Sequence, residues 1–131
     1  MDTSLNLFTY GTLMVPELMF QLTGRNFRSI EAQLPDYKRF TVQGEVYPAV
    51  LKAQGVVTKG ILYFNVSEPD LKKLDQFEGE IYFPEKVEVF DIEGKKEHAI
   101  VYCLKDDFKH LKSSIDWDFD YFLRHHLKNF L

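Results

Sequence analysis

The chain has 131 residues and a mass of 15.4 kDa, a length typical of one domain with a buried core. It is 45% hydrophobic and 27% charged, as globular folds are, and it lacks the apolar run of about 20 residues that spans a bilayer. The net charge of −4 and the pI near 5.5, with no cluster of Lys and Arg, argue against nucleic acid as the main partner. We therefore expect a single domain over residues 1–131 that binds neither nucleic acid nor membrane.

The N-terminal residues MDTSLN contain neither a basic segment nor a long apolar stretch, so we expect no signal peptide and a cytoplasmic location. Cys103 is the only cysteine, which excludes an internal disulfide and a cysteine-based zinc cluster. Its apolar surroundings favour a small buried side chain over a nucleophile. His125 and His126 are adjacent and point apart on a helix, so we expect surface residues and not a metal pair.

Residues 5–13, LNLFTYGTL, form a short apolar run that stops at a glycine turn. Residues 15–22 then predict a helix, because Pro16 is tolerated in a first turn and Gly24 follows the last periodic apolar residue. A strand, a tight turn and a helix in this order leave free backbone N–H groups beside a helix N-terminus, an arrangement that favours an anion. The same pattern also fits an ordinary turn that binds nothing.

The next part of the chain predicts strands, because it is rich in aromatic and β-branched residues. Pro35-Asp36 and residues 43–45 are expected to separate the first three strands, and a fourth strand contains Gly60. A glycine inside a strand indicates a β-bulge or a close approach to the backbone, and we expect the bulge. The four predicted strands are residues 28–34, 37–42, 47–52 and 56–66.

A second helix is predicted to open at Ser67, with Asp70 as its capping-box partner and Gly79 just past its end. Residues 85–92 and 97–104 predict a β-hairpin. The tail from Asp116 predicts a helix with one apolar face, because apolar residues recur at steps of three and four: Phe119, Phe122, Leu123, Leu127 and Phe130. These elements predict an α+β fold, with a small mixed or antiparallel sheet that resembles a β-barrel and flanking helices.

Glu78 lies in the last turn of the second predicted helix. The C-terminal end of a helix is the negative end of its dipole, so a buried carboxyl group there tends toward a raised pKa and could exchange protons near neutral pH. A solvated surface glutamate fits the same position. We expect Asp75 and Glu80 to be solvated, although either could raise the pKa of Glu78 as a like charge.

Five motifs occur in a fixed order along nearly the whole chain: YGTL at residues 10–13, YPAV at 47–50, Gly60, LDQFEGEIY at 74–82, and Trp117-Asp118. In this combination they resemble the gamma-glutamylcyclotransferase-like family, in its small AIG2-like branch. The resemblance implies a small mixed α+β fold built on a β-barrel. It also implies release of 5-oxoproline from a small gamma-glutamyl substrate.

By this resemblance, Glu78 falls on the family's catalytic acid/base. The substrate-binding loop falls on Tyr10, Gly11, Thr12 and Leu13. Tyr47 and Tyr82 are candidates for substrate contact, although tyrosines near strand ends also serve as packing residues. Because the substrate's own α-amine is the nucleophile, the chemistry requires no protein nucleophile, and we expect no metal and no cofactor.

One position departs from the family pattern, since Pro84 stands where a basic residue is expected two positions after Tyr82. This leaves two functions open: an enzyme that cyclises a gamma-glutamyl amine or peptide, and a catalytically inert module that binds a small acidic metabolite on the same fold. A third reading is the removal of a gamma-glutamyl protecting group in a biosynthetic pathway. The sequence does not define the leaving amine or the oligomeric state.

Overall fold

The computed structural model describes residues 5–131; residues 1–4, on which part of the signal-peptide expectation rests, lie outside the described residues. Five strands form a closed barrel in the order β1-β3-β2-β4-β5. β1 runs parallel to β5, and the other neighbouring pairs are antiparallel. The strands are β1 (Leu5–Thr9), β2 (Ser29–Thr41), β3 (Pro48–Val66), β4 (Tyr82–Asp91) and β5 (Lys96–Leu104).

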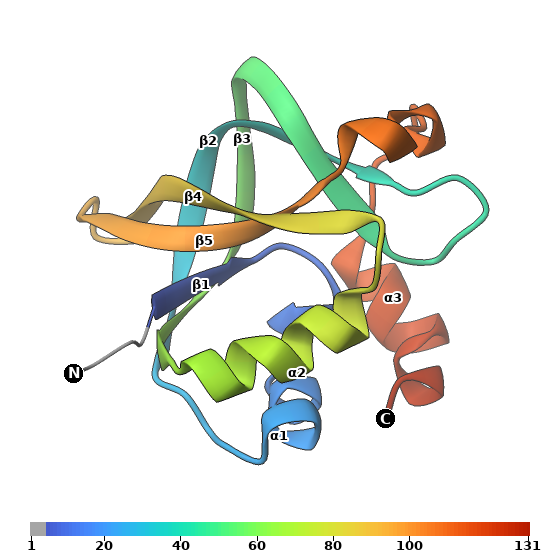
Figure 1. Ribbon diagram of the computed structural model, residues 1–131. Coiled ribbons are helices and arrows are strands. Elements are labelled where there is room, and N and C mark those ends of the chain that lie inside the picture. Colours follow the sequence, from blue (N-terminus) through green and yellow to red (C-terminus); the bar gives the residue numbers. More distant parts are fainter. Residues whose placement is uncertain (1–4) are drawn as a thin grey trace.

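The helices lie on the outside of the barrel, and Figure 1 shows α1 and α2 packed together beneath it. The predicted α+β class, a barrel-like mixed sheet with flanking helices, is confirmed by this arrangement. Among the described residues, no helix is long and apolar enough to cross a membrane. The helical elements are α1 (Pro16–Thr23), α2 (Glu68–Glu78), α3 (Phe119–His125) and the 3-10 turns η1 (Thr12–Met14), η2 (Asp106–Leu111) and η3 (Leu127–Asn129).

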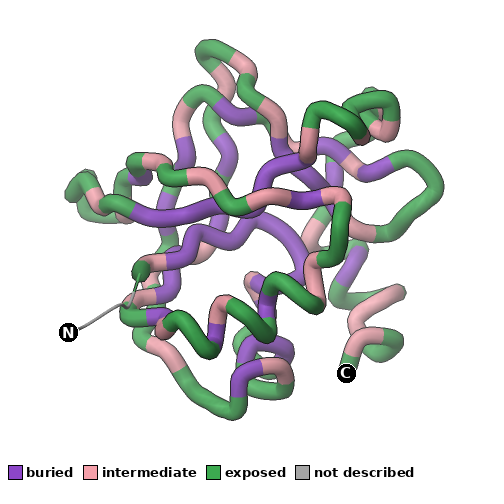
Figure 2. The backbone as a smooth tube through the Cα atoms, in the orientation of Figure 1, coloured by how far each residue is buried: buried purple, intermediate pink, exposed green. Residues whose placement is uncertain are grey.

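The buried apolar residues form two clusters, one inside the barrel and one between the barrel and the helices. Successive strand side chains point to opposite faces, so Phe8 belongs to the inner cluster and Leu7 to the outer one. The inner cluster draws on all five strands, whereas the outer cluster includes Leu18 of α1 and Leu74 of α2. Figure 2 shows that buried positions run along β1 and β5, which cross the middle of the molecule.

The predicted turn at Pro35-Asp36 is wrong, because β2 passes through these residues without ending. The register between β2 and β3 shifts between Pro35 and Tyr37, and Asp36 has a φ of 66°. Its carboxylate accepts a hydrogen bond from the backbone N–H of Gly55 (2.9 Å). The feature is a β-bulge in which Asp36 is left unpaired, and prolines within sheets are found beside such bulges. β3 is likewise one strand where two were predicted.

The predicted bulge at Gly60 is also wrong, because Gly60 pairs with Ala32 in regular register. The second explanation, a close approach, applies: a Cβ atom at this position would lie 2.0 Å from the carbonyl oxygen of Thr9. No side chain fits in that space. Gly60 therefore allows the end of β1 to lie directly against β3.

α2 confirms the sequence signals at both of its ends. The Ser67 hydroxyl accepts from the Asp70 N–H (3.3 Å), and the Asp70 carboxylate accepts from the Ser67 N–H (3.0 Å), which completes a capping box. Asp70 also forms an ion pair with Arg25 (3.3 Å). Gly79 follows the helix with a φ of 84°, a conformation that favours glycine.

The hairpin of β4 and β5 is confirmed, and β4 begins at Tyr82, earlier than predicted. The C-terminal prediction is only partly right, because α3 ends at His125 and η3 follows it. Phe122 is buried as expected, but Leu123 is exposed. His126, between the two elements, has φ −127° and ψ −21°, which leaves the helical path and turns the later residues away from the predicted face.

Candidate active site

A pocket of about 160 Å³ lies between the end of β1, the start of β3 and the C-terminal end of α2. It brings together every residue that the sequence singled out as catalytic or substrate-binding. These residues are Tyr10, Gly11, Thr12, Leu13, Tyr47, Glu78 and Tyr82. Sequence positions as far apart as 10 and 82 therefore meet in one cavity.

The turn after β1 is held by hydrogen bonds to its carbonyl groups. Arg39 donates to the carbonyl of Tyr10 (2.8 Å), and the Tyr63 hydroxyl donates to that of Leu13 (2.8 Å). The N–H groups of Met14 and Val15 donate to the carbonyls of Gly11 (3.0 Å) and Thr12 (3.2 Å). Within residues 5–131 the N–H groups of residues 11–13 have no acceptor, which leaves them available to an anionic ligand.

The glycine in this turn, Gly11, is required by a close contact with the neighbouring strand. A Cβ atom there would lie 2.6 Å from Cγ of Pro48. The YGTL and YPAV motifs therefore meet at this contact, which fixes the turn against the first residue of β3.

The expected contribution from the first helix is wrong. A 3-10 turn, η1, separates β1 from α1, and in the described part of the chain no residue of α1 lines the pocket. Pro16 at the start of α1 has no N–H group to offer. The available donors are therefore those of the turn itself.

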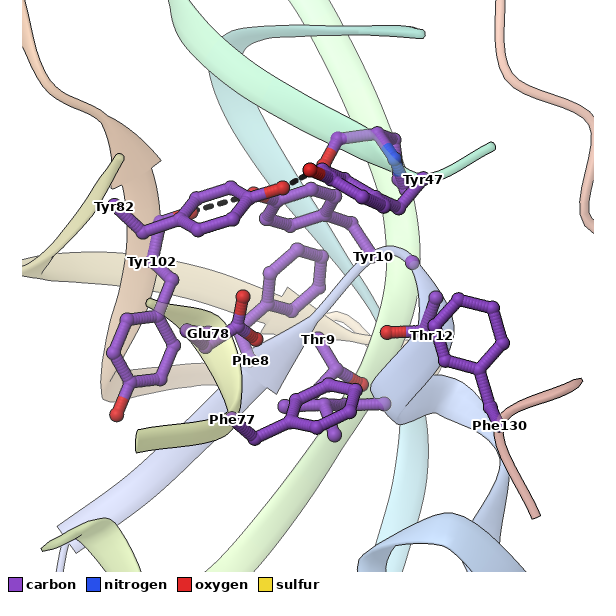
Figure 3. A pocket seen from close by; sticks show the side chains of 13 residues that line it. Phe8, Thr9, Tyr10, Thr12, Tyr47, Phe77, Glu78, Tyr82, Tyr102 and Phe130 are labelled. Carbon is purple, nitrogen blue, oxygen red and sulfur yellow. Dashed lines mark hydrogen bonds between the residues drawn. The ribbon is translucent and has the colours of Figure 1, made fainter. Parts of the chain in front are cut away.

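Glu78 is the last residue of α2, and its side chain points into the pocket (Figure 3). Burial of the carboxyl group raises its pKa to about 8, and the negative charge of Asp75 adds to this shift. The residue as a whole is only half-buried, because the helix end is accessible while the side chain extends inward. Among the described residues, no hydrogen bond or ion pair reaches the Glu78 carboxylate.

Asp75 lies one helical turn before Glu78 and is exposed as predicted, but its carboxylate is not simply solvated. It accepts a hydrogen bond from the Tyr102 hydroxyl of β5. This bond ties the last turns of α2 to the barrel wall. Glu80 is exposed and does not contribute to the pKa shift of Glu78.

Two tyrosines in the pocket have hydroxyl groups that donate to backbone carbonyls. Tyr10 donates to the carbonyl of Tyr102 (2.6 Å), and Tyr82 donates to that of Pro48 (2.7 Å), as the dashed lines in Figure 3 show. Burial raises the pKa of both hydroxyls well above the usual value. Because both hydroxyl protons are already donated to backbone carbonyls, these tyrosines shape the pocket by packing. Tyr47 is half-buried, and its ring lies 6.5 Å from that of Tyr82.

The sequence analysis missed several lining residues. Thr9 stands beside the YGTL motif and Pro48 belongs to YPAV, so both had a local signal. Phe130 had none, because only the course of the C-terminal segment brings it to the pocket. The missed residues are Phe8, Thr9, Pro48, Phe77, Tyr102 and Phe130.

Pro84, which replaces the expected basic residue, is exposed on β4 and is not among the residues that line the pocket. It pairs with Tyr102 in the hairpin. The residue that stands at this position therefore does not itself line the pocket. Cys103 is buried, as predicted.

Residues 7–119 match the family described as gamma-glutamyl cyclotransferase, AIG2-like, so the chain belongs to this family. AIG2-like protein D of Arabidopsis thaliana is 32% identical over 130 residues, which cover 96% of this chain and 84% of that relative. A solution structure of an Arabidopsis thaliana protein is 27% identical, with a TM-score of 0.76 over 97% of this chain and 77% of that one. A gamma-glutamyl cyclotransferase structure shares the fold at 21% identity, with a TM-score of 0.67 over 78% and 67% of the two chains.

The chemical resources of the pocket are a carboxyl group and a set of backbone donors. A group with a pKa of about 8 takes up and releases protons at neutral pH. Free amides stabilise a negative charge that is bound or that develops beside them. In the described chain, no group of three His, Cys, Asp or Glu side chains is placed to hold a metal ion.

Proposed function

We propose that this protein is a gamma-glutamyl cyclotransferase, which releases 5-oxoproline from a gamma-glutamyl amine or peptide. The observation that carries the proposal is the meeting of Glu78, whose carboxyl group has no partner among the described residues, with the free amides of residues 11–13 in one pocket. Membership of the family supports the same reaction class.

In the proposed reaction, the substrate's α-nitrogen forms a bond to its own side-chain carbonyl carbon. The bond from that carbon to the leaving nitrogen then breaks, and no water is consumed. Because the attack is intramolecular, holding the substrate in a curled form removes much of the barrier, with effective molarities of about 10⁵ M or more for good geometry. The walls of a small pocket supply this constraint.

Glu78 carries the proton in this scheme. As a carboxylate it accepts a proton from the α-ammonium, and as an acid it returns the proton to the leaving amine, which together contribute about 10² to 10⁴ in rate. The amides of Gly11, Thr12 and Leu13 bind the substrate carboxylate or the developing oxyanion, at about 3 kcal/mol per well-placed donor. Every step of the scheme therefore uses a residue that lines the pocket.

The test is release of 5-oxoproline from a panel of gamma-glutamyl amides, peptides and gamma-glutamyl-lysine by the wild type, Glu78→Gln and Glu80→Gln. Glu80 is a matched control, because it is exposed, close in sequence and outside the pocket. Product from the wild type and Glu80→Gln, with little from Glu78→Gln, supports the proposal. No product from a folded wild type across the panel overturns it and favours a binding module.

A further inference from the structure

The pocket has a buried floor and a half-buried mouth. The turn residues, Thr9 and Tyr102 are buried, whereas Tyr47, Phe77, Glu78 and Phe130 are half-buried. A ligand that enters from solvent therefore passes these four residues first. Three of the four are aromatic.

The aromatic residues at the mouth come from three separate segments and are held in place. Phe77 and Phe130 contact one another edge to face, with ring centroids 6.4 Å apart. Phe130 also packs on buried Phe122 (5.3 Å), and the Gln21 side chain donates to its carbonyl (3.3 Å). A C-terminal segment beyond the family match at residue 119 thus supplies a wall of the pocket.

The pocket is small, so we expect one part of a substrate to lie inside it and the rest to lie at its mouth. The cavity has a volume of about 160 Å³. This space suits a glutamyl group held by the turn amides beside Glu78. The leaving amine then lies between the aromatic side chains.

The charges of the pocket restrict which leaving amine fits. The thirteen lining residues, all in the described part of the chain, include no Lys, Arg or His. Glu78 is the only acidic side chain among them. A carboxylate on the leaving amine therefore finds no cation at the mouth, whereas an apolar or aromatic group finds aromatic contacts.

We propose that Tyr47, Phe77 and Phe130 form a subsite for the leaving amine, and that it selects gamma-glutamyl substrates whose amine is apolar and uncharged. This inference rests on the proposed function, because it assumes that the glutamyl group occupies the floor. Phe130 is the residue that determines specificity in this subsite, since it comes from outside the family match.

The test measures the dissociation constants of three gamma-glutamyl amides with Glu78→Gln, which binds without turnover under the proposed mechanism. The methylamide has no ring, the benzylamide adds an aromatic ring, and the 4-carboxybenzylamide adds a charge to that ring. We expect the benzylamide to bind about tenfold more tightly than the methylamide, and the carboxylate to abolish this gain. Phe130→Ala, added to Glu78→Gln, is expected to reduce the preference for the ring to below about threefold.

Phe130→Leu and Phe90→Ala, each in the same background, complete the design. Phe130→Leu keeps an apolar wall and should retain part of the preference, which guards against a folding defect in the alanine variant. Phe90 is an exposed phenylalanine on β4 outside the pocket, so its loss should change nothing. Equal affinity for the methylamide and the benzylamide, or a preference for the ring that survives Phe130→Ala, overturns the subsite.

Turnover by the wild type separates this inference from the proposed function. If the wild type releases 5-oxoproline while the amides bind equally, the function stands and the subsite fails. If the amides bind with the expected preference but give no product, the subsite stands and catalysis fails. If neither the wild type nor Glu78→Gln binds any of the three amides, the proposed function and the subsite are both overturned.

Discussion

Two half-buried glutamates lie close together in the sequence but have opposite surroundings. Glu78 faces the pocket, and no partner reaches its carboxylate within residues 5–131. Glu85 of β4 accepts hydrogen bonds from the Tyr37 hydroxyl (3.0 Å) and the Cys103 thiol (3.4 Å), and it lies 3.8 Å from the Lys52 ammonium. The Glu85 carboxylate is engaged in these hydrogen bonds and this ion pair, so Glu85 stabilises the barrel. The Glu78 carboxylate has no such partner among the described residues and is available for proton transfer.

The largest expected difference between the two glutamates is in activity. Glu78→Gln removes the proposed proton carrier and should lower kcat by about 10² to 10⁴. Glu85→Gln leaves the pocket intact and should change kcat by less than about threefold. Rates of 5-oxoproline release, with circular dichroism to verify folding, measure both, and a similar loss in the two variants would break the comparison.

The pH dependence of the rate should report Glu78. Its carboxyl group must be ionised to accept the proton, and the pKa of about 8 belongs to the ligand-free protein, so kcat/KM is expected to rise with pH to a midpoint near 8, by about tenfold per unit well below it. Glu85→Gln should keep this midpoint. A profile that is flat from pH 5 to pH 9 would exclude Glu78 as the base.

The effects on stability should have opposite signs. The raised pKa means that folded Glu78 keeps its proton between about pH 4.5 and 8 while the unfolded chain loses it, so the free energy of unfolding falls as pH rises. Glu78→Gln should therefore become more stable than the wild type as pH rises, up to a plateau above pH 8. Glu85→Gln should lose about 1.5 to 3 kcal/mol at neutral pH, because it removes a charged hydrogen-bond acceptor. Urea unfolding at pH 5, 7 and 9 measures both.

The smallest expected effect concerns Asp75. Its charge raises the pKa of Glu78 only as the second cause after burial, so Asp75→Asn should move the midpoint of the rate profile to lower pH by a fraction of a unit. Tyr102→Phe is the control, because it removes the hydrogen bond from the Tyr102 hydroxyl to Asp75 but keeps the Asp75 charge. An unchanged midpoint in Asp75→Asn would assign the shift to burial alone.

The sequence predicted best the features that depend on near neighbours. The capping box at Ser67, the glycine that ends α2 and the hairpin of β4 and β5 each have signals within a few residues. Glu78 and the YGTL turn were found because their motifs are local, and because the motifs together resemble the family. The structure places them in one pocket, and their roles stay predictions.

Features that depend on distant contacts were predicted poorly. The reason for Gly60 is the backbone of β1, and the barrel closes through the pairing of Leu7 with Ile100, which no local pattern encodes. Asp36 looked like a turn because proline and aspartate favour turns, but pairing with β3 on both sides of it kept β2 continuous. Phe130 joins the pocket only through the packing of the C-terminal segment.

The two close glycine contacts divide the pocket into a fixed part and an adjustable part. Gly11 contacts Pro48, and Gly60 contacts Thr9. Both contacts place the turn and the end of β1 directly against β3, and neither leaves room for a methyl group. The side chains at the mouth are not restricted in this way. A new leaving-group preference is therefore open to engineering through Tyr47, Phe77 and Phe130, while the amides that we propose to hold the glutamyl group stay where the backbone places them.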